Sequence, residues 1–170
     1  MQIEPIIGKY KSESGNEYIF EYYDADSFDH LPHNMCRQVY GLAFHGNKLL
    51  VVNNVEKPGS YTPVGGSVEK DEHPDDALVR EIKEESNMKV LMFKPIGYQK
   101  VITINGTKEP YYQLRYFCTV EPYGAFESDP AGKVTELIEC NIGDYKKYFD
   151  WGAIGDRIME RAIEFRKELK

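Results

Sequence analysis

Residues 65–88 read GGSVEKDEHPDDALVREIKEESNM, and this stretch decides how the rest of the chain is interpreted. It opens with two glycines and continues into a segment typical of a helix. Pro74 suits the first turn of a helix, and the two aspartates that follow it complement the helix dipole there. Asn87 is a suitable stop, because Asn tolerates the left-handed conformation after a helix. The segment therefore predicts a helix over residues 74–86.

Three glutamates share one side of this predicted helix. Because a helix advances about 100° per residue, Glu81, Glu84 and Glu85 fall within a sector of roughly 100°. Like charges three and four residues apart destabilise a helix by about 0.2–0.5 kcal/mol per pair. A hard divalent cation relieves that repulsion, and oxygen-rich sites suit Mg²⁺ or Mn²⁺. Arg80 can pair with Glu84 one turn on.

The neighbouring residues indicate how the helix is set into the fold. Leu78, Val79 and Ile82 occupy the adjoining sector, which predicts a buried face. Ala77 lies within the carboxylate sector, and its small side chain predicts an open surface there. The alternative interpretation of the glutamates is a solvated acidic face. The glycine pair at 65–66 favours a site instead, because missing side chains let the backbone approach a ligand closely.

Together these residues resemble the Nudix box, the signature of the Nudix (MutT-type) pyrophosphohydrolases. That box reads Gly, five residues, Glu, seven residues, Arg-Glu, an aliphatic residue, any residue, Glu-Glu, any residue, Gly, aliphatic. The chain matches it, with the spacing right throughout, at Gly66, Glu72, Arg80, Glu81, Ile82, Glu84, Glu85 and Met88. It departs at the last glycine, which is Asn87. Because Asn is the next best residue for a left-handed turn, we expect Asn87→Gly to leave activity intact.

The resemblance implies a hydrolase that uses Mg²⁺ or Mn²⁺ to cleave a nucleoside diphosphate linked to another group, or a nucleoside triphosphate. It implies that Glu84 and Glu85 are the principal metal ligands and that the Gly65 carbonyl completes the metal shell. Glu81 would be a further ligand or the base that activates water. Arg80 would orient a glutamate, and Glu72 would anchor the loop to the helix.

In many relatives another acidic residue, from a loop distant in sequence, acts as base or extra ligand. The candidates in this chain are Glu121, Glu127, Asp129 and Glu136. We prefer Glu127 and Glu136 because they lie in or next to the predicted loop over residues 122–135. The alternative for each is a solvated surface carboxylate, since most acidic residues are exposed.

The flanking sequence predicts strands on both sides of the helix. Turn-forming residues at 12–16 predict a hairpin over residues 8–23, and residues 24–36 read as a polar loop. Apolar periodicity predicts a second, C-terminal helix over residues 152–168. Strands are expected at 38–45, 48–53, 89–104, 111–121 and 136–142, with a short extended piece at 61–64. This order predicts an α/β fold in which helices cover both faces of a mixed sheet, and the resemblance implies a Nudix-type α/β/α sandwich.

Length and charge restrict the class of protein. The chain has 170 residues and a formal net charge of −7, so one domain over residues 1–170 is expected. The acidic balance disfavours DNA binding, which depends on positive charge. No apolar run approaches the ~20 residues that a membrane span needs. A nucleotide-derived small molecule is the expected partner, and the C-terminal helix is a candidate contact for a homodimer.

The cysteines and the N-terminus predict a cytoplasmic protein. The three cysteines are odd in number and far apart, which fits a reducing compartment. Residues 1–7 lack the basic start and long apolar stretch of a secretory signal. His30, His33 and Cys36 have metal-like spacing, but a structural zinc usually needs four ligands in recognisable pairs. No second pair is evident nearby, so a polar loop is favoured there.

The sequence is also compatible with a function from another class. A Nudix-fold module could bind or sense a nucleotide without turnover. A sensor need not keep a full set of catalytic carboxylates, so the intact set of Glu81, Glu84 and Glu85 favours the enzyme.

Overall fold

The structure is a computed structural model that describes residues 4–127, 129–130, 132 and 134–170. In these residues nine strands form one sheet of order β1-β2-β7-β8-β3-β4-β5, with β6 paired to β3 and β9 paired to β4. The β3–β8 pairing is parallel and the others are antiparallel, so the sheet is mixed. The strands are β1 (Ile6–Lys11), β2 (Glu17–Asp24), β3 (Cys36–His45), β4 (Lys48–Asn54), β5 (Tyr61–Thr62), β6 (Val64–Ser67), β7 (Met88–Thr103), β8 (Tyr111–Pro122) and β9 (Val134–Asn141).

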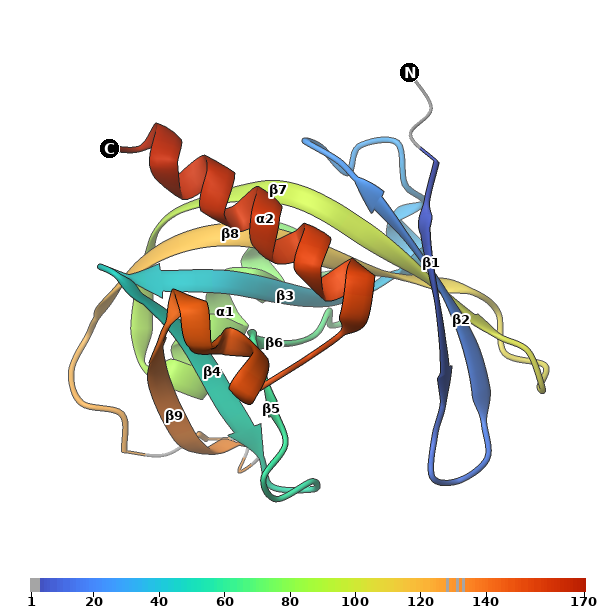
Figure 1. The fold of residues 1–170 in the computed structure, drawn as a ribbon, viewed down its shortest axis with the longest axis horizontal. Helices are drawn as coiled ribbons and strands as arrows, with labels where there is room; N and C mark the ends of the chain where they lie inside the picture. Colours follow the sequence, from blue (N-terminus) through green and yellow to red (C-terminus); the bar gives the residue numbers. More distant parts are fainter. Residues whose placement is uncertain (1–3, 128, 131, 133) are drawn as a thin grey trace.

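Two α-helices cover opposite faces of this sheet. The helix α1 (Pro74–Ser86) lies behind the sheet in the view of Figure 1, and α2 (Gly152–Glu168) crosses in front of it. Alternation along β3 supplies both layers, because successive side chains of a strand point to opposite faces. Val39 packs in the core under α1, whereas Leu42 packs in the core under α2. The predicted α/β/α sandwich with a mixed sheet is confirmed.

Most predicted elements agree with the structure to within about two residues. The helix over 74–86 and the helix over 152–168 have the predicted bounds. The extended piece at 61–64 instead contains the whole of β5 and the first residue of β6, and both glycines lie inside β6. The two 3₁₀ helices, η1 (His33–Met35) and η2 (Ile142–Lys147), were not predicted.

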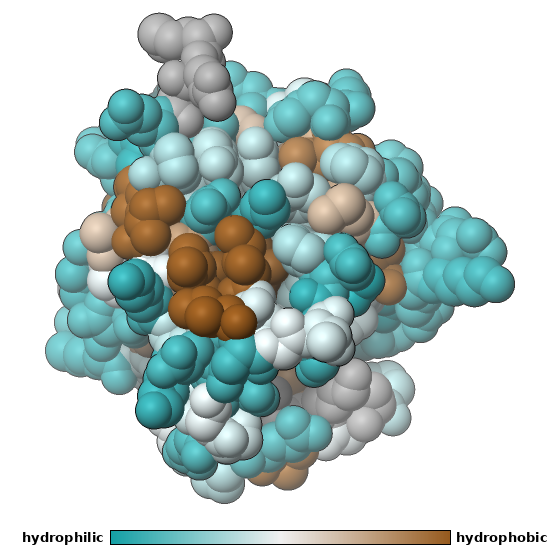
Figure 2. Space-filling view, turned by 90° about the vertical axis from the view of Figure 1, so that its right-hand side faces the viewer, coloured by the Kyte–Doolittle hydropathy of each residue, from teal (hydrophilic) through white to brown (hydrophobic). Residues whose placement is uncertain are grey.

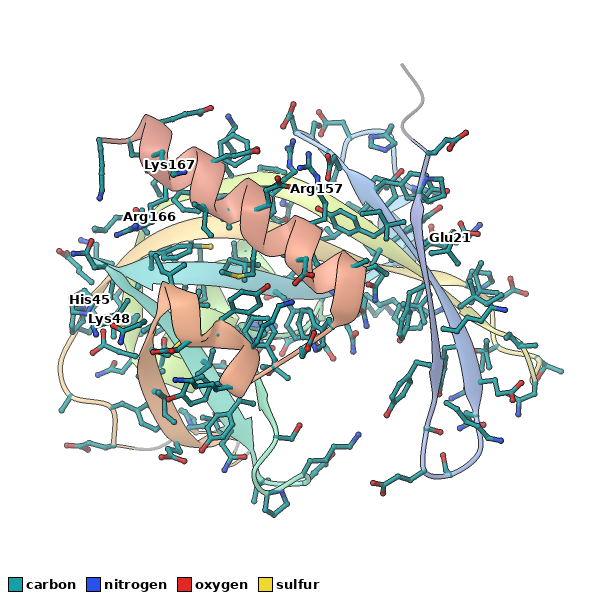
Figure 3. The ribbon with its side chains drawn as sticks, viewed as in Figure 1. Glu21, His45, Lys48, Arg157, Arg166 and Lys167 are labelled. Atoms are coloured by element: carbon teal, nitrogen blue, oxygen red, sulfur yellow. The ribbon has the colours of Figure 1, made fainter. Side chains whose placement is uncertain are left out.

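The β1–β2 hairpin is fastened to α2. Arg157, labelled on α2 in Figure 3, donates from Nη2 to Asp24 Oδ2 at the end of β2, at 2.6 Å. Gly8 on β1 leaves room for α2, because a Cβ there would lie 3.1 Å from Ile154 Cδ1. The C-terminal end of α2 is fixed as well, since Arg166 Nη2 donates to Gly46 O at 3.1 Å. The helix therefore joins the hairpin to the β3–β4 turn.

The outer face of the hairpin carries apolar side chains. Strand register places Ile7, Ile19 and Ile102 on one face, away from α2, and Ile7 is 53% exposed. Figure 2, seen from the hairpin side, shows apolar residues gathered among hydrophilic ones. The expected homodimer stays a prediction.

Within the described ranges, neither helix has the length and apolar character needed to cross a lipid bilayer.

Candidate active site on helix α1

The helix that carries the glutamates begins and ends as the sequence predicts. His73 is its N-cap, and His73 Nδ1 accepts a hydrogen bond from the Asp75 N–H at 3.2 Å. Asn87 ends the helix in the left-handed conformation, with φ 53° and ψ 35°. The strand β6 is therefore followed by a helix whose start and end are both defined by local chemistry.

Two expectations about the helix faces were wrong. Leu78 and Ile82 are buried as predicted, but Val79 is 39% exposed and Ala77 is fully buried. Because α1 packs against β3, β6 and β7, the buried face is rotated toward Ala77. The carboxylate side of the helix is therefore partly covered by the sheet rather than left open.

The glutamates do not form a solvated acidic face. The side chain of Glu81 is 13% exposed, Glu85 is 8% exposed, and the side chain of Glu84 is 35% exposed. Burying carboxylates is costly unless they are paired or hydrogen-bonded. Buried glutamates therefore need charged or polar partners around their carboxylates.

Arg80 is the main partner of these carboxylates. Its Nε and Nη2 donate to the two carboxylate oxygens of Glu72 at 2.8 and 2.9 Å. Its Nη1 donates to Glu81 Oε1 at 2.8 Å and to Glu84 Oε2 at 3.3 Å. Hydrogen bonding from Arg80 lowers the pKa of Glu72, and the same contacts raise the pKa of Arg80. One guanidinium thus ties the loop before α1 to two glutamates of the helix.

The two glycines bring the backbone of β6 against the glutamates. The Gly65 N–H donates to Glu85 Oε2 at 3.0 Å. A Cβ at Gly66 would lie 2.5 Å from the carboxyl carbon of Glu81, and a Cβ at Gly65 would overlap the Val39 carbonyl oxygen. Glycine at 66 therefore lets β6 approach the glutamate of α1 closely, and glycine at 65 lets β6 approach the backbone of β3.

The oxygen atoms of the three glutamates and of the Gly65 carbonyl suit a hard divalent cation. Carboxylate oxygens and a backbone carbonyl are the ligands that Mg²⁺ and Mn²⁺ prefer. Across the part of the chain that the structure describes, no three His, Cys, Asp or Glu side chains converge as a ready-made ligand set. Arg80 engages Glu81 and Glu84, so loading a cation would exchange part of that pairing for coordination.

The structure separates the four candidates for an additional carboxylate. Glu127 lines a cavity of about 700 Å³ together with Glu84 and Arg80. Glu136 lies on β9 and accepts a hydrogen bond from the Tyr61 hydroxyl at 2.8 Å. Asp129 is buried and accepts from the Val134 N–H at 3.0 Å. Glu121 on β8 lies 3.9 Å from Lys89 Nζ. Glu127 is thus the candidate that shares the 700 Å³ cavity with Glu84.

Arg115 on β8 is a residue that the sequence reasoning missed. It is 3% exposed, and burial lowers its pKa to about 10. Its Nη2 donates to Gln113 Oε1 at 2.9 Å, while its Nε and Nη1 find no partner among the described residues. The guanidinium lies 4.8 Å from the ring centre of Tyr40, which pairs with Gly65 across β3 and β6. An arginine inside a predicted strand was the feature of the sequence that could have indicated this buried charge.

The side chains of His30, His33 and Cys36, which have metal-like spacing in the sequence, do not meet at one point. The His30 ring packs against Tyr98, and the His33 ring lies 5.7 Å from that of His73. Cys36 Sγ donates to Pro32 O at 3.6 Å. The three side chains thus have separate neighbours. The predicted polar loop is correct only in part, because His33–Met35 form η1 and Cys36 is a buried residue of β3.

Comparison with solved structures finds the same fold. The Bacillus subtilis pyrophosphohydrolase BsRppH, in a mutant form, aligns with 92% of this chain and 96% of its own, at 18% identity and a TM-score of 0.66. A MutT NUDIX hydrolase from Burkholderia pseudomallei aligns with 74% of this chain and 96% of its own, at 18% identity and a TM-score of 0.57. A C. elegans Ap4A hydrolase aligns with 78% of this chain and 98% of its own, at 15% identity and a TM-score of 0.57.

Comparison with curated protein sequences returns no match.

The family model described as the NUDIX domain matches residues 36–160, which contain the box, α1 and the N-terminal half of α2. This match confirms the resemblance drawn from the box residues. The chain therefore belongs to the Nudix family.

Proposed function

We propose that the protein is a Nudix hydrolase that depends on a divalent cation and cleaves the pyrophosphate bond of a nucleoside diphosphate-X or a nucleoside triphosphate. The supporting observation is that Arg80 contacts Glu81 and Glu84 while the backbone of β6 contacts Glu85, so each of the three glutamates of α1 has a fixed partner. These three glutamates and the Gly65 carbonyl would hold Mg²⁺ or Mn²⁺. When bound, the cation supplies positive charge against the diphosphate oxygens.

The protein's own residues supply proton transfer and positioning. A carboxylate takes one proton from the attacking water, whose oxygen bonds to phosphorus as the bridging P–O bond breaks. Glu81 and Glu127 are the candidates for this base. Arg80 keeps Glu81 in place through the 2.8 Å hydrogen bond, which favours a fixed orientation of the carboxylate during the reaction. No covalent protein nucleophile is needed.

The substrate class is a small nucleotide derivative. A net charge of −7 disfavours long nucleic acids, since few phosphates could be neutralised. Two neighbours with the same fold are named as an Ap4A hydrolase and a UDP-X diphosphatase. At 15% and 16% identity these names guide only the choice of compounds to test. We further propose that the protein acts in the cytoplasm.

A nucleotide panel tests this function. Nucleoside triphosphates, nucleotide sugars and dinucleoside polyphosphates would be incubated with the protein and Mg²⁺, Mn²⁺ or EDTA, and release of phosphate or pyrophosphate measured. We expect release with either cation and none with EDTA. Glu84→Gln should lower turnover at least a hundredfold, whereas Glu164→Gln, an exposed position on α2, should not. Tight nucleotide binding without release from any compound would favour the sensing module instead.

A further inference from the structure

The residue that departs from the box pattern makes two hydrogen bonds with the segment after β8. Asn87 Nδ2 donates to Ala125 O at 3.1 Å, and Asn87 O accepts from the Tyr123 N–H at 3.0 Å. Lys83, one turn earlier on α1, places its Nζ 5.2 Å from the centre of the Tyr123 ring. The C-terminal end of α1 and residues 123–125 are therefore fastened by both backbone and side chain.

The fastened segment leads directly to the candidate carboxylate. Glu127 follows Ala125 by two residues, and it lines the same cavity as Glu84 and Asn87. Residues 123–127 belong to no helix or strand. Their path therefore depends on such tethers, because an irregular segment gains order only from specific contacts that offset its conformational entropy.

A glycine at position 87 would retain only part of this arrangement. Glycine adopts φ 53° readily, so the helix end and the Tyr123 backbone hydrogen bond would persist. The carboxamide that donates to Ala125 O would be lost. Such a hydrogen bond contributes about 0.5–1.5 kcal/mol, equivalent to roughly a 2- to 12-fold change in the equilibrium constant between the tethered and the released loop.

We propose that Asn87 is a positioning residue, whose carboxamide ties residues 123–127 to the end of α1 and so holds Glu127 in the cavity beside Glu84. This inference rests on the proposed function for its effect on turnover. It replaces the expectation, drawn from backbone conformation alone, that Asn87→Gly leaves activity intact.

A double-mutant cycle tests the proposal, using the best substrate of the panel with Mg²⁺. Asn87→Gly should lower kcat about 3- to 10-fold with little change in KM, as expected when loss of one hydrogen bond depopulates the loop. Glu127→Gln should lower kcat further, and Asn87→Gly should have almost no added effect in the Glu127→Gln background. Asn16→Gly, in the distant β1–β2 turn, should leave kcat unchanged.

Hydrogen exchange supplies a readout that does not depend on turnover. Backbone amides of residues 124–127 should exchange faster in Asn87→Gly than in the wild type, while those of α1 should keep their protection. The proposal would be overturned if Asn87→Gly had the same kcat and the same exchange rates as the wild type. It would also be overturned if Asn87→Gly lowered kcat equally in the wild-type and Glu127→Gln backgrounds. If the wild type hydrolyses no compound of the panel, the proposed function fails, and the exchange rates alone decide whether the tether exists.

Discussion

Arg80 and Arg115 show two different environments for a guanidinium in this protein. Arg80 donates to Glu72, Glu81 and Glu84, so its charge is matched by carboxylates. Arg115 is more deeply buried, and its Nη2 donates to the neutral Gln113. The first arrangement stabilises the helix and its loop. The second carries a desolvation cost, which the Gln113 hydrogen bond and the rings of Tyr40 and Trp151 offset only in part.

The pairing of Glu72 with Arg80 predicts a pH dependence of stability. The pKa of Glu72 is lower in the folded protein than its ordinary value of 4.5. Its contribution is therefore fully present above about pH 4.5 and is lost as pH falls through the lowered pKa. Glu72→Gln should lower the free energy of unfolding by about 1–3 kcal/mol at pH 7. Urea unfolding between pH 2.5 and 7 should show this difference shrinking below pH 4.5, and a constant difference would contradict the pairing.

Replacing the buried Arg115 tests whether removing a buried charge raises the free energy of unfolding. Arg115→Met keeps most of the side-chain volume and removes the buried charge, so the free energy of unfolding should rise by about 1–3 kcal/mol. Arg80→Met serves as the matched comparison and should destabilise, because it leaves three carboxylates without their guanidinium. Both are measured by urea unfolding at pH 7. A loss of stability in Arg115→Met would show that its guanidinium has a favourable partner.

At the scale of elements, the site is formed by α1 packed against β6. The helix bounds were predictable from local chemistry, because Pro74 and Asn87 act through the backbone conformation of single residues. The strand around the glycines was not predictable, since β6 exists through its pairing with β3. The error at Ala77 and Val79 has the same origin, because the neighbouring strands decide which face of the helix is buried. The bond from Asn87 to Ala125 joins residues 38 apart in sequence, and no local pattern encodes it.

The two glycines of β6 should respond differently to alanine. In Gly66→Ala the new Cβ meets the end of the Glu81 side chain, which can move, so the protein should fold while hydrolysis falls more than tenfold. In Gly65→Ala the new Cβ meets the backbone of Val39 and Tyr40, so stability should fall by about 1–3 kcal/mol or more. Thermal unfolding and hydrolysis rates of both variants check this, and similar stability losses would contradict it.

At the scale of the molecule, α2 links the hairpin to the rest of the sheet (Figure 1). The family model begins at residue 36, so β1 and β2 lie outside the matched region although they continue the same sheet. The hairpin was predictable from its turn-forming residues, and the helix from its apolar periodicity. Their junction through Asp24 and Arg157, 133 residues apart, was not, because either residue alone reads as an ordinary surface charge.

Breaking the junction between Asp24 and Arg157 should destabilise the hairpin locally. The Asp24 side chain is 12% exposed and pairs with Arg157, whereas the Asp26 side chain is 76% exposed and pairs with Arg161. Asp24→Asn should lower the free energy of unfolding by about 1–3 kcal/mol, and Asp26→Asn by less than about 0.5 kcal/mol. Hydrogen exchange in β1 and β2 should quicken only in Asp24→Asn. Equal effects of the two variants would show that burial of the pair is unimportant.

The central claim, that the glutamates of α1 hold a divalent cation, is tested most directly by titrating the protein with Mn²⁺ and following the free ion by electron paramagnetic resonance. We predict that the wild type removes Mn²⁺ from solution and that Glu84→Gln combined with Glu85→Gln weakens this binding at least tenfold, with far-ultraviolet circular dichroism unchanged. Equal Mn²⁺ binding by the wild type and the double variant would contradict the account.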